Sequence, residues 1–309
     1  MKILITGSNG LLGQKLVYKL KNSSEFTCIA TARGANRLVK QDGYVYETLD
    51  ITNSENVNQV FLKHLPDVVI NTAAMTNVDA CETEREACWT MNVSSVLNQV
   101  KSLEELKNKH PNYKPHFIHL STDFIFDGTH GPLDENETPN PLSYYAESKL
   151  AAEKIVTSCN LDWAIARTVL VYGIVDNMSR SNIVLWVKSN LEQGKIINVV
   201  DDQFRTPTLA EDLADGCILI AQKRAKGIYN ISGKDYYSIL ELANVVADYY
   251  KLDKSLIKPS KSADIKQPAK RPPITGFIID KAKKELGYQP HSFTEGIQIL
   301  ERQINEITK

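Results

Sequence analysis

The stretch KILITGSNGLLG, residues 2–13, decides the fold. Its apolar first part predicts a buried strand, and the leucines that recur at a spacing of four as far as Leu20 predict a helix directly after it. Three glycines separate the two elements. Such a turn lets a pyrophosphate approach the backbone and the free N–H groups of the helix amino end. The order of strand, glycines and helix therefore predicts dinucleotide binding, with a purely structural turn as the alternative.

Within this turn the glycines permit the sharp change of direction, and the absence of Cβ atoms permits close approach. The candidate cofactor contacts in the turn are Gly7, Asn9, Gly10, Leu11, Leu12 and Gly13.

Strands and helices continue to alternate after this first pair. Val96, Val100 and Leu103 repeat the helical spacing, and several strand candidates are apolar almost throughout, as in a parallel sheet covered on both faces. The pattern predicts right-handed crossovers and an α/β fold, a doubly wound parallel sheet of the Rossmann type. The candidate strands are Lys2–Thr6, Thr27–Ala32, Tyr44–Leu49, Asp67–Asn71, His116–Leu120 and Trp163–Arg167.

The alternation of strands and helices becomes less regular beyond residue 170. We divide the chain into a dinucleotide-binding domain, 1–170, and a smaller substrate-binding lobe, 171–309, that is partly interleaved with it. Residues 258–273 are rich in Lys, Ser and Pro and predict a surface loop. The other elements expected in this half are helices at Asn182–Glu192, Leu209–Gln222, Ser238–Tyr250 and Ser292–Ile307 and strands at Ile196–Val200 and Gly227–Ile231.

Composition narrows the classes of partner. The 36 basic and 37 acidic side chains among 309 residues give a net charge of −1, so no overall field draws the chain to nucleic acid or an anionic membrane. Five cysteines without metal-ligand spacing are expected to be free thiols, and no metal is predicted. The amino end does not resemble a signal peptide, and no apolar run reaches the roughly 18 residues of a membrane span, so we expect a cytoplasmic protein.

Two arginines follow the second predicted strand, Arg33 and Arg37. NAD sites usually place a carboxylate here for the ribose hydroxyl, whereas an arginine suits a 2′-phosphate. We therefore expect NADP(H), with NAD(H) as the alternative. Asp50 and Ile51, after the third strand, are expected beside the adenine, or else Asp50 caps the turn that follows it.

Tyr145 and Lys149 stand four residues apart, a spacing that puts both on one face of a helix. A phenol with a pKa near 10 is a poor acid at neutral pH, and a nearby ammonium should lower that pKa. Thr122 ends the fifth predicted strand, where it can share a carbonyl oxygen with Tyr145. His116 and His119 on the same strand have no metal spacing and are expected to pack structurally.

These motifs resemble the extended short-chain dehydrogenase/reductase superfamily and, within it, the dTDP-4-dehydrorhamnose reductase family. The glycine and Tyr-Lys motifs specify only the superfamily. The segments LSTDFIFDG and DQFRTPT are more specific to the family. The matching segments are 6–13, 71–79, 120–128, 145–149 and 202–208.

The resemblance implies a reductase of a nucleotide-activated 4-keto-6-deoxy sugar, and it leaves a homodimer open. It implies a catalytic triad of Thr122, Tyr145 and Lys149. Tyr145 and Lys149 would also contact the cofactor, together with Ala73, Ala74, Thr76 and Asn92. The implied substrate contacts are Thr76, Thr122, Asp123, Tyr145, Arg205 and Arg271.

Two positions depart from the family pattern on the substrate side. Leu170 stands where the family often has a tryptophan, and Arg205 stands where many members have a small residue. Arg205 could reach a diphosphate or occupy the sugar pocket. Two alternatives remain open: an epimerase or dehydratase that keeps NAD bound, and a regulatory module like the beta subunit of methionine adenosyltransferase. Intact Thr122, Tyr145 and Lys149 favour catalysis.

Overall fold

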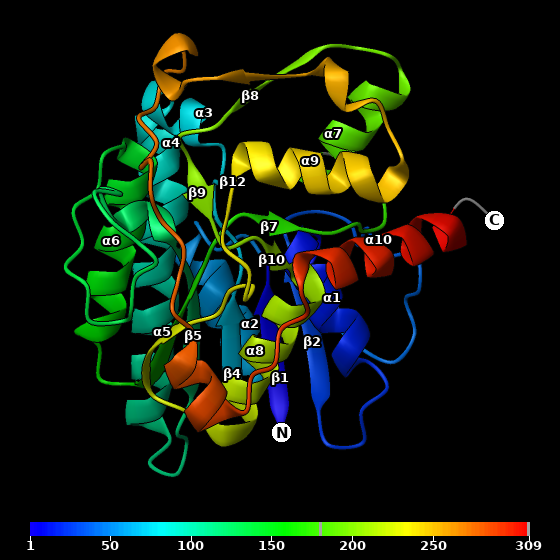
Figure 1. Cartoon of the computed structure of the whole chain (residues 1–309). Helices are drawn as coiled ribbons and strands as arrows, with labels where there is room; N and C mark the ends of the chain where they lie inside the picture. Colours follow the sequence, from blue (N-terminus) through cyan, green and yellow to red (C-terminus); the bar gives the residue numbers. More distant parts are fainter. Residues whose placement is uncertain (179–180, 308–309) are drawn as a thin grey trace.

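The centre of the protein is a seven-stranded parallel sheet, seen in a computed structural model that describes residues 1–178 and 181–307 (Figure 1). The strand order is β11-β6-β5-β4-β1-β2-β3, which reverses direction beside β1 as in a doubly wound sheet. This confirms the predicted Rossmann-like fold. The strands are β1 (Lys2–Thr6), β2 (Thr27–Ala32), β3 (Val45–Thr48), β4 (Val68–Asn71), β5 (His116–Thr122), β6 (Asp162–Thr168) and β11 (Gly227–Asn230).

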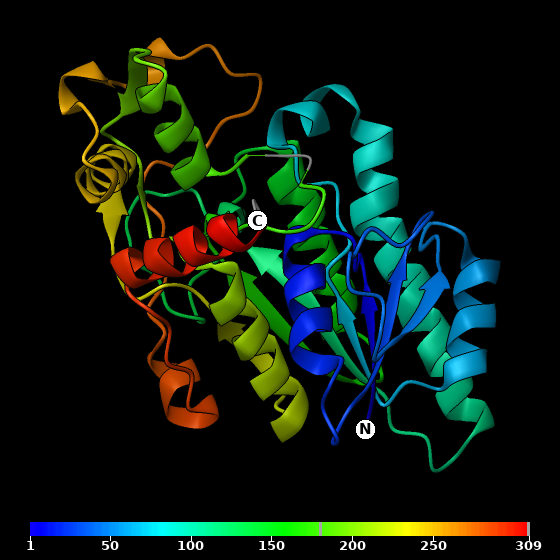
Figure 2. The ribbon, with the colours of Figure 1, turned by 90° about the vertical axis from the view of Figure 1, so that its right-hand side faces the viewer.

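Helices cover both faces of the sheet and explain why its strands are apolar throughout (Figure 2). Along β1, Ile3 and Ile5 join the core under α1 and α8, whereas Leu4 joins the core under α2, α5 and α6. Alternate residues of a strand point to opposite faces, so each needs an apolar neighbour. The five helices are α1 (Leu11–Leu20), α2 (Ser54–His64), α5 (Ser95–Lys109), α6 (Tyr144–Thr157) and α8 (Ala210–Lys223).

The second half of the chain contributes to two bodies of structure. The helix α8 packs on α1, and β11 extends the main sheet beyond β6. The remaining elements enclose a third core of their own, which lies above the carboxyl ends of the strands in Figure 1. They are α7 (Ile183–Glu192), α9 (Ile239–Tyr250), α10 (Phe293–Ile307), β8 (Ile197–Val200) and β13 (Ile257–Ser260).

One prediction for this half was wrong in part. Residues 258–273 were expected to form a surface loop, but β13 pairs in parallel with β8, and Ile257 is buried in the third core. The composition of the segment concealed the strand, because Pro259 lies opposite Val199 in a two-stranded sheet. Proline is tolerated at such an edge, where one side of the strand needs no ladder bond.

Short elements connect the two bodies. Two small sheets pair β7 (Val171–Tyr172) with β10 (Thr208–Leu209) and β9 (Phe204–Arg205) with β12 (Tyr237–Ser238). The helices α3 (Val78–Thr83) and α4 (Arg85–Trp89), a π-helical turn η1 (Thr90–Ser94) and a 3-10 turn η2 (Asp123–Ile125) lie near α6. Among the described residues, no helix is long and apolar enough to cross a membrane.

Candidate active site at the carboxyl edge of the sheet

The glycine turn has the geometry that a pyrophosphate requires. Gly7 has φ of +70°, and the Gly10 N–H donates to the Gly7 carbonyl at 2.9 Å. A Cβ on Gly13 would lie 2.3 Å from that carbonyl oxygen, so only glycine allows α1 to approach the turn so closely. No side chain caps the amino end of α1, which begins at Leu11. Its first N–H groups therefore suit a phosphate, and the residues present fit a dinucleotide.

Asn9 ties the glycine turn to the loop after β2. Its Nδ2 donates to the Ala35 carbonyl at 2.9 Å, and its Oδ1 accepts from the Arg37 N–H at 2.9 Å. The loop carries Arg33 and Arg37 with exposed side chains at the carboxyl edge of β2. Both side chains are therefore accessible from solvent, and their contact with a 2′-phosphate stays a prediction.

Asp50 adopts the local role that was its alternative interpretation. Its Oδ1 accepts from the backbone N–H of Thr52 at 2.9 Å and from the Thr52 hydroxyl at 2.6 Å. These bonds, followed by the Arg33 charge, hold the pKa of the carboxyl below its usual value despite partial burial. Ile51 is buried in the core under α2 and α5. An adenine contact from either residue stays a prediction.

The segment after β4 lies directly against the glycine turn. A Cβ on Gly7 would come within 2.9 Å of the Ala73 backbone, so the two segments touch. The buried side chain of Asn92 holds this segment from the other side, because its Oδ1 accepts from the Met75 N–H at 2.7 Å. Its Nδ2 donates to the Ser148 hydroxyl of α6 at 3.0 Å. Asn92 thus positions the backbone around Ala74 and the exposed Thr76 relative to α6.

Tyr145, Thr122 and Lys149 come together where β5 ends and α6 begins. Ser143 caps α6 by accepting from the Ala146 N–H, which places Tyr145 in the first turn of the helix. Thr122, at the end of β5, lies near enough to the Tyr145 phenol to lower its pKa. The Lys149 ammonium donates to the carbonyl of Leu120, two residues before Thr122, at 2.6 Å. The three side chains are buried, as the Tyr-Lys spacing alone could not indicate.

The predicted effect of Lys149 on the tyrosine does not hold in this geometry. Burial raises the pKa of the Tyr145 phenol above its usual value, and the Asp123 carboxylate adds to the rise. The Thr122 side chain opposes both, and Lys149 is not one of the largest causes of the shift. The physical reason is that Nζ of Lys149 is directed toward Leu120 and His119. Burial lowers the pKa of Lys149 itself to about 8.

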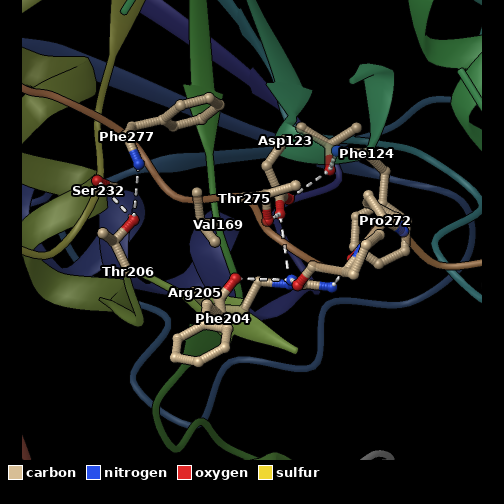
Figure 3. Close-up of polar contacts among 12 residues, drawn as sticks. Asp123, Phe124, Val169, Phe204, Arg205, Thr206, Ser232, Pro272, Thr275 and Phe277 are labelled. Atoms are coloured by element: carbon tan, nitrogen blue, oxygen red, sulfur yellow. Dashed lines mark hydrogen bonds and ion pairs between the residues drawn. The ribbon is translucent and has the colours of Figure 1, made fainter. Parts of the chain in front are cut away.

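Arg205 and Asp123 form a buried cluster (Figure 3). The guanidinium of Arg205 is 3.6 Å from the Asp123 carboxylate and donates to the carbonyls of Phe204, Pro272 and Pro273 at 2.7 to 3.0 Å. Asp123 also accepts from the Thr122 hydroxyl at 3.1 Å and the Thr275 hydroxyl at 2.5 Å.

This arrangement differs from the expectation that Arg205 reaches an anion. Its side chain is about 4% exposed, and its donors are directed at backbone carbonyls. Burial lowers its pKa, and the Asp123 charge opposes that effect. Direct substrate contact by Arg205 or Asp123 would need this cluster to rearrange and stays a prediction.

Arg271 bridges the two halves of the chain. Its guanidinium binds both carboxylate oxygens of Asp79, at 3.1 and 2.7 Å, and this ion pair holds the pKa of Asp79 below its usual value. The predicted phosphate contact of Arg271 stays a prediction. Leu170, in the position expected for an aromatic ring, has φ of +38°, a backbone conformation that costs energy for a branched side chain.

Several polar residues that hydrogen-bond the site residues were not identified from the sequence. Ser148 and Asn71 gave no signal, because single serines and asparagines are common on helices and at strand ends. Thr275 and Asp79 meet their partners across 152 and 192 residues of chain. His119 was noticed only as a packing residue, although its alternation with Ser121 on β5 places both on the face toward α6.

Sheets wound in this order bind dinucleotides where the strand order reverses, and the glycine turn stands at that point. With the Tyr-Lys pair on α6, the fold and site define a protein of the extended short-chain dehydrogenase/reductase class. The chain belongs to the family described as the RmlD substrate binding domain, whose model matches residues 1–305.

Relatives of this chain have different named roles. It is 28% identical to the probable low-salt glycan biosynthesis reductase Agl14 of Haloferax volcanii, over 97% of both chains. It is 30% identical to methionine adenosyltransferase 2 subunit beta of Rattus norvegicus, over 84% of this chain and 75% of that one. The structure of a dTDP-4-dehydrorhamnose reductase of Bacillus anthracis in complex with NADP superposes with a TM-score of 0.82, at 26% identity, covering 98% of this chain and 99% of that one.

Proposed function

We propose that this protein is an NADPH-dependent reductase of a nucleotide-activated 4-keto-6-deoxy sugar. The observation that carries the proposal is the arrangement of three buried side chains, with Thr122 at the end of β5 beside α6, Tyr145 in the first turn of α6 and Lys149 one helical turn further along. The similar structure of a dTDP-4-dehydrorhamnose reductase from Bacillus anthracis in complex with NADP supports the choice of reaction and cofactor. Exposed Arg33 and Arg37 support NADP over NAD.

In the proposed reduction, each residue of the site has a separate role. The hydride for such a reduction comes from a bound nicotinamide dinucleotide. Thr122 and Tyr145 hold the ketone oxygen, and Tyr145 gives it the proton as the alcohol forms. The raised pKa of Tyr145 keeps the phenol protonated at neutral pH, and the same shift makes it a weaker acid than a free phenol. Lys149 orients the cofactor ribose, and the residues from Ala73 to Thr76 line the cofactor path beside Gly7.

The test is the loss of NADPH absorbance with a panel of nucleotide 4-keto-6-deoxy sugars. Tyr145→Phe should lower turnover by roughly 10² or more, the usual weight of a proton-transfer group, while NADPH affinity stays within a few-fold. Tyr144→Phe is the matched control, because it removes the hydroxyl of the neighbouring tyrosine and should leave turnover unchanged. Equal turnover in wild type and Tyr145→Phe would refute the role of Tyr145.

A second function is favoured by the relatives named as methionine adenosyltransferase subunit beta. A regulatory module would bind dinucleotide and a partner enzyme without turnover. A chain that binds NADPH, reduces no keto sugar in the panel and co-purifies with a methionine adenosyltransferase would favour this second function.

A further inference from the structure

The side chain of His119 lies beside Lys149, and the proposed mechanism gives it no task. It projects from β5 and is 1% exposed. Its Nε2 is 3.2 Å from Nζ of Lys149, and its Nδ1 is 3.1 Å from Nδ2 of Asn71. The imidazole lies parallel to the ring of Phe117, with centroids 6.4 Å apart. Both nitrogens and one face of the imidazole are therefore held in place.

The direction of these hydrogen bonds follows from one backbone carbonyl. The oxygen of Ser95 can only accept, and Nε2 of Gln99 donates to it at 3.1 Å. The same Gln99 nitrogen donates to Oδ1 of Asn71 at 3.3 Å, and the Thr6 hydroxyl donates to that oxygen at 2.6 Å. The Asn71 oxygen thus faces two donors, and its Nδ2 group faces His119. Nδ1 of His119 must accept, so the proton of the neutral imidazole resides on Nε2.

This tautomer directs an N–H group at Lys149. An ammonium has three donors and no lone pair, so it cannot accept that hydrogen. A neutral amine can accept it from His119 and still donate to the carbonyl of Leu120, at 2.6 Å. The hydrogen bonds around Nζ are therefore all satisfied when Lys149 is uncharged.

We propose that His119 is a positioning residue whose Nε2–H favours the neutral amine of Lys149, with its tautomer fixed by the chain from Ser95 through Gln99 and Asn71. The consequence for catalysis rests on the proposed reductase function, whereas the hydrogen-bond assignment does not. In that function the Lys149 ammonium holds the cofactor ribose, so turnover should decline on the alkaline side as Lys149 loses its proton.

The electrostatic surroundings agree with this assignment. Burial lowers the pKa of Lys149 to about 8 and holds the pKa of His119 well below its usual value. The opposing charges on Lys149 are weaker, because the buried Glu153 carboxylate already pairs with Arg167 at 2.8 Å. The titratable and charged groups that act on the Lys149 amine are Glu153 on α6, Cys88 on α4 and His119 on β5. Beyond them, Asp123 on η2 and Cys81 on α3 act on Tyr145, and Arg167 on β6 pairs with Glu153.

The first test reads the tautomer of His119 directly by ¹⁵N NMR of the imidazole, without substrate or cofactor. The expected result is the Nε2–H tautomer around neutral pH. Asn71→Asp is nearly isosteric, and the Thr6 and Gln99 donors can hold the new carboxylate. Because a carboxylate only accepts, this variant should switch His119 to the Nδ1–H tautomer. An Nδ1–H tautomer in the wild type, or no switch in the variant, would overturn the proposal.

The second test follows turnover against pH. His119→Phe keeps a ring to stack on Phe117 but removes the N–H, so the pKa of Lys149 should rise and the alkaline decline of kcat should move up by about one pH unit. His116→Phe is the matched control, since it removes a buried imidazole from the opposite face of β5 and should leave the profile unmoved.

A uniform loss of kcat at every pH in His119→Phe would show a merely structural role and would overturn the proposal. If that variant does not fold, the tautomer in wild type and Asn71→Asp decides. If the tautomers are as expected but no keto sugar is reduced, the proposed function fails while the assignment of His119 stands.

Discussion

The cofactor side and the substrate side of the candidate site consist of different chemical groups. The cofactor side presents backbone N–H groups from the glycine turn and exposed arginines on the loop after β2. The substrate side holds its charges in the interior, where Arg205 and Asp123 are almost fully buried. On the first side a lost group should weaken binding and little else. On the second, the same loss should weaken the fold, because a buried charge without its partner is costly.

The largest effect that would test this contrast is expected from Arg205→Met. The variant leaves the Asp123 carboxylate buried with only hydroxyl partners, and breaking a buried ion pair costs about 3–5 kcal/mol. We expect the free energy of unfolding, measured by urea titration, to fall by that order. The loss should be smaller at pH 5 than at pH 7, since burial already raises the pKa of Asp123 and a protonated carboxyl needs no counter-charge.

The matching double variant, Asp123→Asn with Arg205→Met, removes both charges and should recover part of the loss. A single Arg205→Met chain as stable as the wild type would show that the substrate side does not depend on the buried pair.

In contrast to Arg205→Met, Lys149→Met should raise the free energy of unfolding. The pKa of Lys149 is about 8 in the folded chain and about 10.4 when unfolded, so at neutral pH folding must bury a disfavoured charge. A methionine removes that cost but leaves the Leu120 carbonyl unpaired, for a net gain of about 2 kcal/mol. The unfolded chain binds more protons between these two pKa values, so the wild type gains stability as pH rises through this range. The advantage of the variant, measured by urea titration at pH 7 and pH 10, should therefore shrink, while turnover is lost at both.

Arg33→Ala sharpens the comparison from the cofactor side. Loss of the guanidinium should weaken NADPH binding about tenfold and spare NADH, because only NADPH carries the 2′-phosphate. Fluorescence titration with both cofactors measures this, and Lys40→Ala is the control for a lost positive charge on the same exposed loop. Equal losses for the two cofactors would remove the basis for the NADP preference.

The smallest effect is expected from Asp79→Asn. This carboxylate is about one-third exposed, so its ion pair with Arg271 should be worth less than about 1 kcal/mol of unfolding free energy. If Arg271 also binds a substrate phosphate, freeing it from Asp79 should lower KM for the nucleotide sugar a few-fold. An unchanged KM would leave Arg271 a purely structural residue.

The cofactor side could be predicted from sequence because its parts are neighbours in the chain. The strand, the glycines and the helix fall within residues 2–20, and Tyr145 and Lys149 are one helical turn apart. The bounds of β1 and β2 match those expected, since each contains three consecutive apolar residues with a polar residue on either side.

The substrate side could not be predicted in the same way. Asp123 meets Thr275 across 152 residues, and no local pattern encodes such a meeting. Nor could the sequence tell that the Lys149 amine is directed toward Leu120 and His119. How far a lysine lowers the pKa of a neighbouring phenol depends on its burial and orientation, and only the packing of α6 on β5 sets them.

The position of β11 at the edge of the main sheet affects folding during synthesis and the expression of fragments. Until residues 227–230 leave the ribosome, β6 exposes a row of unpaired backbone groups along one edge. An open strand of this kind invites pairing with another molecule. A fragment that stops after β6 would be a poor candidate for separate expression, because the edge of β6 is covered only when the second half of the chain supplies β11.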